Sequence, residues 1–399
     1  MTRVALLPSA YPPSVGGVEE LTRHLALALI AAGDEVEVWT GNPDDREPET
    51  VEIRDGLVVR RFPMPLPAGN WSALSHVASA GPRTMRALRR AVASFRPDVL
   101  HVQCFGPNGA YATGLARITG LPLVVTLQGE TQMDDGDLFN VSQVMRTSLR
   151  AGLRTAAAVT ACSAFSLDDA VTRFGLRPGS GVVIWNGVSL DDPGPAAPVA
   201  GPLAALGDRP YVLALGRVVE KKGFDLLLAG YAAMDPADRT ADLVIGGTGP
   251  ALEQLESQAE ESGIKDRVHF LGRLTRGQVE AAMAGAQIFV MPSRLEPFGI
   301  VVLEAWRAGT AVVATSRGGP PEFVRDGIDG ILVDPFDKVA VAEVLGRLLS
   351  DADLRRSIAV AGRTRVVEFA WPVVADRYRE LYASAVPGAD RIGQRAGAS

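Results

Sequence analysis

The chain has 399 residues, more than one hydrophobic core usually supports, so two domains are expected. Hydrophobic residues make up 47% and charged residues 22% of the sequence, which is typical of globular proteins and excludes a disordered or fibrous chain. The net charge of −6 argues against nucleic acid as a partner, because domains that bind it are normally basic. Cys104 and Cys162 lack metal-ligand spacing and are too few for a disulfide framework, so we interpret them as buried thiols in a reducing cytosol.

The amino-terminal segment MTRVALLPS predicts a buried strand and not a secretion signal, because its apolar run ends at Pro8. No segment approaches the roughly 20 consecutive apolar residues of a membrane-spanning helix. We therefore expect a cytoplasmic protein, and peripheral contact with a membrane stays open.

Short apolar runs alternate with helix-length amphipathic segments in the first half, a pattern typical of parallel sheets built from βαβ units. One helical segment is expected to end at Gly33 and another before Pro97. The sequence thus predicts a Rossmann-like domain over residues 1–190. Its expected strands are VALLPS, EVEVWT, DVLHVQ, LPLVVTLQ and AAVTACS.

Residues 191–210 are rich in Pro, Gly and Ala and are interpreted as a linker. The alternation then begins again, which predicts a second Rossmann-like domain over 211–370. The expected fold is α/β, with two doubly wound domains facing a cleft and ligands at the carboxyl ends of the strands. A helix over 371–386 and a disordered tail over 387–399 complete the prediction. The expected strands of the second half are YVLALG, ADLVIGG, RVHFLG, QIFVMPS, AVVATS and GILVDP.

The most informative segment is PSRLEPFGIVVLEAWRAGTAVVATSRGGPPE, residues 292–322. Glu296 precedes a predicted helix start at Gly299, and Glu304 lies one to two turns into that helix. The free N–H groups of the first turn offer a place for an anion, so the two carboxylates can accept sugar and ribose hydroxyls with a diphosphate between them. Taken alone, each glutamate is better explained as a helix-start charge or a solvated residue. The N–H groups belong to Gly299, Ile300 and Val301.

Two cations are predicted on one loop of the second half, in LGRVVEKKGFDLLLAG. Arg217 follows a strand and Lys222 precedes a helix, so both would project toward the cleft and neutralise a diphosphate. A single loop Arg or Lys is commonly just solvated. The Gly-rich loops SVGGVEE and IGGTGP allow close backbone approach, although neither matches the dinucleotide pattern G-x-G-x-x-G.

With these motifs the chain resembles the retaining family-4 glycosyltransferases of GT-B fold. The resemblance covers nearly the whole sequence, and EPFGIVVLE with GR…KKG upstream is its specific signature. It implies transfer of a hexose from a nucleoside diphosphate sugar, with a UDP-sugar favoured, to a hydroxyl group of a small-molecule or lipid-linked acceptor. It also implies that no metal or other cofactor is needed, and that the last helix crosses back onto the amino-terminal domain.

The resemblance further implies roles for single residues. Arg217 and Lys222 would stabilise the leaving diphosphate, and Glu304 would bind the ribose. Glu296 and the backbone near Phe298 would hold the donor sugar. The other donor-binding positions are Gly16, Gly17, Gly216, Gly247, Gly299, Ile300 and Val301.

Two glutamines, Gln103 and Gln128, stand at strand ends where many members of the family carry histidine. Glutamine cannot act as an acid or base near neutral pH, so either it hydrogen-bonds the donor sugar, with Gln128 in the catalytic set, or it only caps a strand end. Acceptor-facing candidates are Gln103, Glu130 and Arg150. Arg150 belongs to a basic stripe, and such stripes are more often solvated faces than sites for a phosphorylated acceptor or a membrane.

The acidic loop MDDGD, residues 133–137, superficially resembles a metal site, but we expect a solvated or acceptor-facing loop. Two other functions remain open on the same architecture. One is a nucleotide-sugar epimerase or hydrolase, which needs no acceptor. The other is a catalytically silent binding module, which the two glutamines make conceivable.

Overall fold

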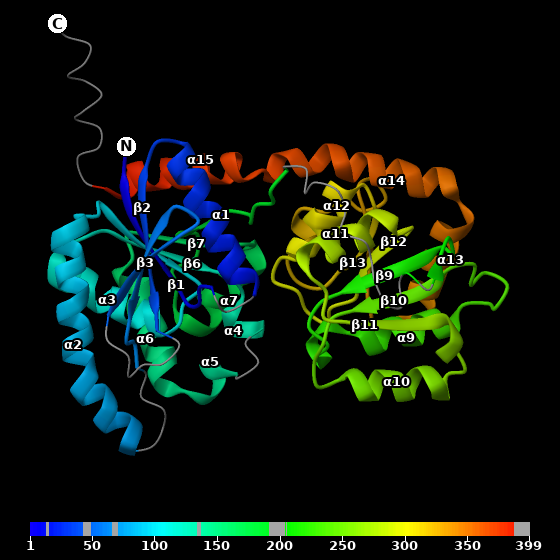
Figure 1. The fold of residues 1–399 in the computed structure, drawn as a ribbon, viewed down its shortest axis with the longest axis horizontal. Helices are drawn as coiled ribbons and strands as arrows, with labels where there is room; N and C mark the ends of the chain where they lie inside the picture. Colours follow the sequence, from blue (N-terminus) through cyan, green and yellow to red (C-terminus); the bar gives the residue numbers. More distant parts are fainter. Residues whose placement is uncertain are drawn as a thin grey trace, which may run out of the picture. The chain divides into compact units, whose positions relative to one another are not determined.

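The computed structural model describes residues 1–12, 16–42, 49–65, 71–133, 137–190, 204 and 206–386. The chain divides into two compact units (Figure 1). Unit 1 contains Met1–Gly187 together with the chain from Trp371 onward, and unit 2 is Val188–Ala370. The predicted linker lies outside the described residues except for 204 and 206–210, and the predicted tail lies wholly outside them.

The sheet of unit 1 has the strand order β3-β4-β2-β1-β5-β6-β7-β8. Its neighbours pair in parallel except β3 and β4, which form an antiparallel hairpin. Every residue of β5 and β6 is buried, as expected for parallel strands that are covered on both faces. The strands are β1 (Arg3–Pro8), β2 (Glu35–Gly41), β3 (Thr50–Arg54), β4 (Leu57–Phe62), β5 (Val99–Gln103), β6 (Leu123–Leu127), β7 (Ala158–Ala161) and β8 (Gly181–Val183).

The last helix of the chain, α15, packs in unit 1 against α1 (Figure 1). The ring of Trp371 stacks on that of His24 with a centroid distance of 5.8 Å. Arg379 Nε donates to Asp34 Oδ2 at 2.9 Å. Unit 1 is therefore completed by a helix from the other end of the chain. The helices of unit 1 are α1 (Gly17–Ala31), α2 (Trp71–Phe95), α3 (Pro107–Thr119), α4 (Glu130–Met133), α5 (Leu138–Val141), α6 (Gln143–Thr155), α7 (Ala164–Phe174) and α15 (Trp371–Ala385).

The sheet of unit 2 is parallel throughout, in the order β11-β10-β9-β12-β13-β14. This is the doubly wound arrangement: β10 and β11 extend the sheet on one side of the first strand, β9, and β12 to β14 extend it on the other side. The ligand crevice of such a sheet is expected at the carboxyl ends of β9 and β12, where the order reverses. The predicted α/β fold of doubly wound domains is confirmed. The strands are β9 (Tyr211–Leu215), β10 (Asp242–Gly246), β11 (Val268–Gly272), β12 (Ile288–Met291), β13 (Ala311–Thr315) and β14 (Ile331–Val333).

Two helices of unit 2 illustrate how a capping side chain marks a helix start. Thr275 and Gln278 form a reciprocal capping box before α11, and the Asp337 side chain caps α13. The helices are α9 (Phe224–Ala233), α10 (Leu252–Glu261), α11 (Arg276–Gly285), α12 (Ile300–Ala308), α13 (Lys338–Ser350) and α14 (Ala352–Arg365), with short 3-10 turns η1 (Glu220–Lys222), η2 (Lys265–Arg267), η3 (Pro320–Glu322) and η4 (Val366–Phe369).

Candidate functional site

An ion pair joins the two loops at the crevice of unit 2. Lys222, in η1 after β9, donates from Nζ to Oε2 of Glu296, after β12, at 2.7 Å. Ser293 Oγ donates to the same oxygen at 2.8 Å. Glu296 is buried and Lys222 is half-buried. The structure thus brings together two residues that the sequence placed on separate loops.

A glycine allows these loops to approach so closely. Gly223 has φ 68°, and a Cβ there would lie 2.0 Å from the carbonyl oxygen of Pro292, so only glycine fits. The contact is extended by Arg294, whose guanidinium makes paired hydrogen bonds to the Asp225 carboxylate at 2.6 and 2.7 Å. The position of Lys222 is therefore set by backbone packing as well as by its charge.

The backbone of Glu296 is fixed from the loop after β13. Its N–H donates to the Arg317 carbonyl at 3.1 Å, and its carbonyl accepts from the Gly319 N–H at 2.8 Å. Phe298, two residues on, stacks on Phe323 at 4.6 Å and is 2% exposed. A ligand here would therefore meet the backbone of Phe298 and not its ring.

Helix α12 begins directly beside this carboxylate. Gly299 is its N-cap with φ 95°, and no side chain caps the helix there. The first N–H groups of a helix have no partner within the helix, so those of Ile300 and Val301 suit an oxygen-rich ligand. Glu304 lies half-buried in the next turn.

The end of β10 lies beside the end of β9. Gly247, after β10, has φ 132°, and a Cβ on it would lie 1.8 Å from the Gly216 carbonyl oxygen. Arg217 follows Gly216 and is exposed at this edge of the sheet. The predicted cation and both glycines therefore occupy the edge that carries the ion pair.

In unit 1 the two glutamines are hydrogen-bonded to each other. Gln103 is the last residue of β5, Gln128 follows β6, and Gln128 Nε2 donates to Gln103 Oε1 at 3.1 Å. Asn186 Nδ2 donates to Gln128 Oε1 at 2.9 Å. Gln103 is 3% exposed and Gln128 is half-buried, so Gln128 is the more accessible of the two.

A buried histidine, which the sequence analysis did not single out, lies behind the glutamines. His101 Nε2 is 2.7 Å from Thr126 Oγ1 and 3.3 Å from Gln103 Nε2, and its Nδ1 is 2.6 Å from Tyr382 Oη. Burial lowers the pKa of His101 to about 3, so the imidazole is neutral at physiological pH. No local pattern could reveal a contact between residues 281 positions apart.

Glu130 ties the same two strand ends through their backbones. Its Oε1 accepts from the Phe105 N–H and its Oε2 from the Gln128 N–H, each at 2.6 Å. Burial raises the pKa of Glu130 to about 7, against the lowering effect of these hydrogen bonds. Both carboxyl oxygens are thus engaged within the protein, a contact that fits a positioning role better than the predicted acceptor-facing one.

The remaining predicted residues of unit 1 have contacts of their own. Arg150 is exposed on α6 and donates to the Arg173 carbonyl at 3.0 Å. Gly16 and Gly17 begin α1, where a Cβ on Gly16 would lie 2.6 Å from the Glu19 carboxylate. In the acidic loop, Asp134 and Asp135 lie outside the described residues, while Asp137 precedes α5 and accepts from Asn140 at 2.5 Å.

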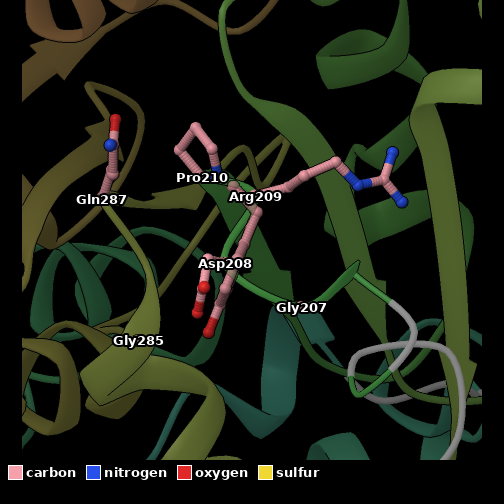
Figure 2. A pocket seen from close by; sticks show the side chains of 7 residues that line it. Gly207, Asp208, Arg209, Pro210, Gly285 and Gln287 are labelled. Atoms are coloured by element: carbon pink, nitrogen blue, oxygen red, sulfur yellow. The ribbon is translucent and has the colours of Figure 1, made fainter.

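A shallow pocket of about 430 Å³ lies at the opposite edge of the unit 2 sheet (Figure 2). Pro210 directly precedes β9 and Gln287 directly precedes β12, so this pocket is at the amino ends of the strands. Its arginine, Arg209, pairs with buried Asp242 at 2.9 Å. It is therefore not the ligand crevice of a doubly wound sheet.

Comparison with known proteins identifies the family. The model of "Glycosyltransferase Family 4" matches residues 15–192, and that of "Glycosyl transferases group 1" matches residues 201–365. A D-inositol 3-phosphate glycosyltransferase of Streptomyces scabiei is 30% identical over 392 residues, which cover 93% of this chain and 87% of that protein. The chain belongs to the family-4 glycosyltransferases. A glycogen synthase of Mycobacterium tuberculosis is 28% identical over 405 residues, covering 97% of this chain and 95% of that enzyme.

Solved structures agree with this family-4 assignment. A sucrose-phosphate synthase from Thermosynechococcus elongatus superposes with a TM-score of 0.77 and 25% identity, covering 96% of this chain and 100% of that one. HepE of Anabaena, solved with UDP, superposes with a TM-score of 0.72 and 20% identity, covering 96% and 100%. These confirm the GT-B fold and, with the curated relatives, a glycosyltransferase enzyme. Among the helices that the structure describes, none is both long and apolar enough to cross a membrane.

Proposed function

We propose that this enzyme is a retaining hexosyltransferase that moves a sugar from a nucleoside diphosphate sugar, preferably a UDP-sugar, to a hydroxyl acceptor. The observation that carries the proposal is the Lys222–Glu296 pair at the crevice of unit 2, beside the uncapped start of α12. The donor class is supported by relatives with this fold, including HepE, which was solved with UDP-glucose.

Leaving-group stabilisation is the chemistry that these residues suit best. Negative charge grows on the β-phosphate as the glycosidic bond breaks, and fixed cations and N–H dipoles lower that barrier. Arg217 and Lys222 supply the cations, and the first turn of α12 supplies N–H groups. With these present, the diphosphate needs no metal ion, and the acceptor proton can pass to the departing phosphate oxygen.

Glu296 has two tasks in this proposal. Both of its side-chain hydrogen bonds recorded in the described part of the chain end on Oε2, which holds Lys222 in place. Oε1 is then the oxygen that accepts a hydroxyl of the donor sugar. Glu304, one turn into α12, accepts the ribose hydroxyls.

A donor-by-acceptor screen read by mass spectrometry tests the proposal. UDP-, GDP-, ADP- and TDP-sugars are each incubated with and without phosphorylated polyols, free sugars and lipid-linked acceptors. Nucleotide release together with a glycosylated product, only when acceptor is present, supports transfer, and the anomeric coupling constant of the product reports retention. A donor altered without acceptor would indicate an epimerase or hydrolase, and binding without turnover a silent module.

A further inference from the structure

Five polar side chains of unit 1 form one hydrogen-bonded chain that runs from the last helix through Gln128 to Asn186. Asn186 contacts Gln128 at 2.9 Å, Gln128 contacts Gln103 at 3.1 Å, and Gln103 contacts His101 at 3.3 Å. His101 in turn contacts Tyr382 on α15 at 2.6 Å. Asn186, Gln103 and His101 are buried, and only Gln128 is half-buried.

The contacts fix the direction of this chain. Gln128 Oε1 accepts from Asn186, and Gln128 Nε2 donates to Gln103 Oε1. Because the oxygen of Gln103 is used, its Nε2 is the atom that faces His101. An amide NH₂ group only donates, so His101 Nε2 must carry the lone pair. The neutral ring therefore holds its proton on Nδ1 and donates it to Tyr382 Oη.

Thr126 supports the same tautomer. Its hydroxyl is 2.7 Å from His101 Nε2 and 2.6 Å from the Thr160 hydroxyl, so it can donate to the ring and accept from Thr160. The hydroxyl of Tyr378, on α15, also lies 3.4 Å from the Thr126 hydroxyl. The ring is thus held from two sides by groups that the chain brings from β6, β7 and α15.

We infer that His101 is a positioning residue whose Nδ1–H tautomer orients Gln103 and Gln128, so that Gln128 offers its second amide N–H to the ligand. Its oxygen accepts from Asn186 and its other N–H donates to Gln103 Oε1. The ligand atom at Gln128 is then a hydrogen-bond acceptor, such as a sugar hydroxyl or ring oxygen. This inference rests on the proposed function, because that atom belongs to the donor sugar.

Nitrogen NMR of the intact, ¹⁵N-histidine-labelled protein tests the tautomer without any substrate. The sequence has four histidines, and the His101 signals are those that persist in the single variants His24→Gln, His76→Gln and His269→Gln. We expect a protonated Nδ1 and an unprotonated Nε2. An Nε2–H tautomer would overturn the inference. This result is independent of whether any donor is turned over, so failure of the proposed function would be seen separately.

A matched pair of variants tests the effect on the ligand. His101→Gln can place an amide oxygen near the Nε2 position and keep an acceptor for Gln103, whereas His101→Leu removes it. We expect His101→Gln to stay within about threefold of the parent in kcat/KM for the donor, and His101→Leu to lose roughly five- to tenfold. The UDP dissociation constant should be unchanged in both, because the diphosphate residues are in unit 2.

A purely structural role would give a different result. In that case His101→Leu would lower the melting temperature, with donor kcat/KM falling only in parallel with the folded fraction, and His101→Gln would bring no selective rescue. Equal kcat/KM in the two folded variants would therefore overturn the inference even if both are less stable than the parent.

Discussion

Lys222 Nζ and Glu296 Oε2 lie 2.7 Å apart and join the loops that follow β9 and β12. The carboxylate is 9% exposed and the lysine 23%, so the pair is partly shielded from solvent. A shielded pair of this kind is costly to break from one side, because the remaining charge stays buried. Glu296 thus keeps Lys222 at the crevice before a donor arrives, while Arg217 is exposed beside it.

Arg217→Ala should lower turnover much more than stability, whereas Lys222→Ala should lower both, because it leaves the shielded Glu296 carboxylate without this cation. Arg217→Ala and Lys222→Ala each remove a group that stabilises charge in the transition state, which typically costs about 2.7–4 kcal/mol, or 10²–10³ in kcat. Steady-state kinetics and thermal melts check this. Lys221→Ala is the matched control, since it removes the same charge one position away in η1. Near-normal turnover in both cation variants would refute the diphosphate assignment.

Glu296→Gln should separate sugar transfer from nucleotide binding. The amide keeps an acceptor for Lys222 and Ser293 but removes the negative charge, so a bound diphosphate meets a more positive site. We expect calorimetry to show that UDP binds the variant at least as tightly as the parent. Donor turnover should fall, because the activation free energy should rise by about 1–3 kcal/mol. Glu220→Gln, a change to an exposed carboxylate in the loop of Lys222, should alter neither quantity. Weaker UDP binding in Glu296→Gln would contradict the arrangement.

Chelator should leave activity intact. Two fixed cations and the start of α12 serve the diphosphate in place of a divalent ion, so turnover in excess EDTA should equal turnover in Mg²⁺. Activity lost in EDTA and restored by Mg²⁺ or Mn²⁺ would instead reopen the acidic loop at residues 133–137 as a metal site.

Glu130 should make stability depend on pH. Burial raises its pKa from 4.5 to about 7. Between these two pH values the folded state therefore holds a proton that the unfolded chain has released. The free energy of unfolding should then fall, on the order of 1–3 kcal/mol, as pH rises from about 5 to 7.5. Glu130→Gln should lose this dependence although it is less stable overall. Denaturant unfolding at several pH values measures the dependence in the parent and in Glu130→Gln. If the free energy of unfolding changes with pH in parallel in both, Glu130 is excluded as the cause.

Much of the fold follows from short apolar runs, because parallel strands buried on both faces are nearly continuous in hydrophobic residues. All eleven expected strands are observed. The β3–β4 hairpin was missed, although Asp55 and Gly56, with φ 51° and 79°, form the Asp-Gly turn that favours a hairpin. The three-residue strand β8 was also missed, since it is too short and too exposed to give a pattern.

The site was predictable where chemistry follows topology. Arg217, Lys222 and Glu296 lie in the loops that follow β9 and β12, and strand ends meet at one edge of a parallel sheet. The hydrogen-bonded chain behind Gln128 was not predictable, because Tyr382 lies on a helix at the far end of the sequence. The four-residue spacing of Tyr378 and Tyr382 indicates only a helix face that packs on a core.

The last prediction concerns Gln128 and follows from side-chain chemistry. Gln128→His should keep part of the activity, because a neutral imidazole offers one donor and one acceptor and so replaces two of the three hydrogen bonds of Gln128. Gln128→Leu should lose much more, since Asn186 Nδ2 and Gln103 Oε1 would each lose the hydrogen bond to Gln128 and the sugar atom would meet an apolar group, at about 1–3 kcal/mol for each unpaired group. The Leu variant should still bind UDP, because Arg217 and Lys222 belong to unit 2 and are untouched. Turnover, UDP affinity and melting temperature measured on both variants separate a lost ligand contact from a lost fold. Full activity in the Leu variant would mean that Gln128 only caps the end of β6, and the donor sugar would have to be placed elsewhere.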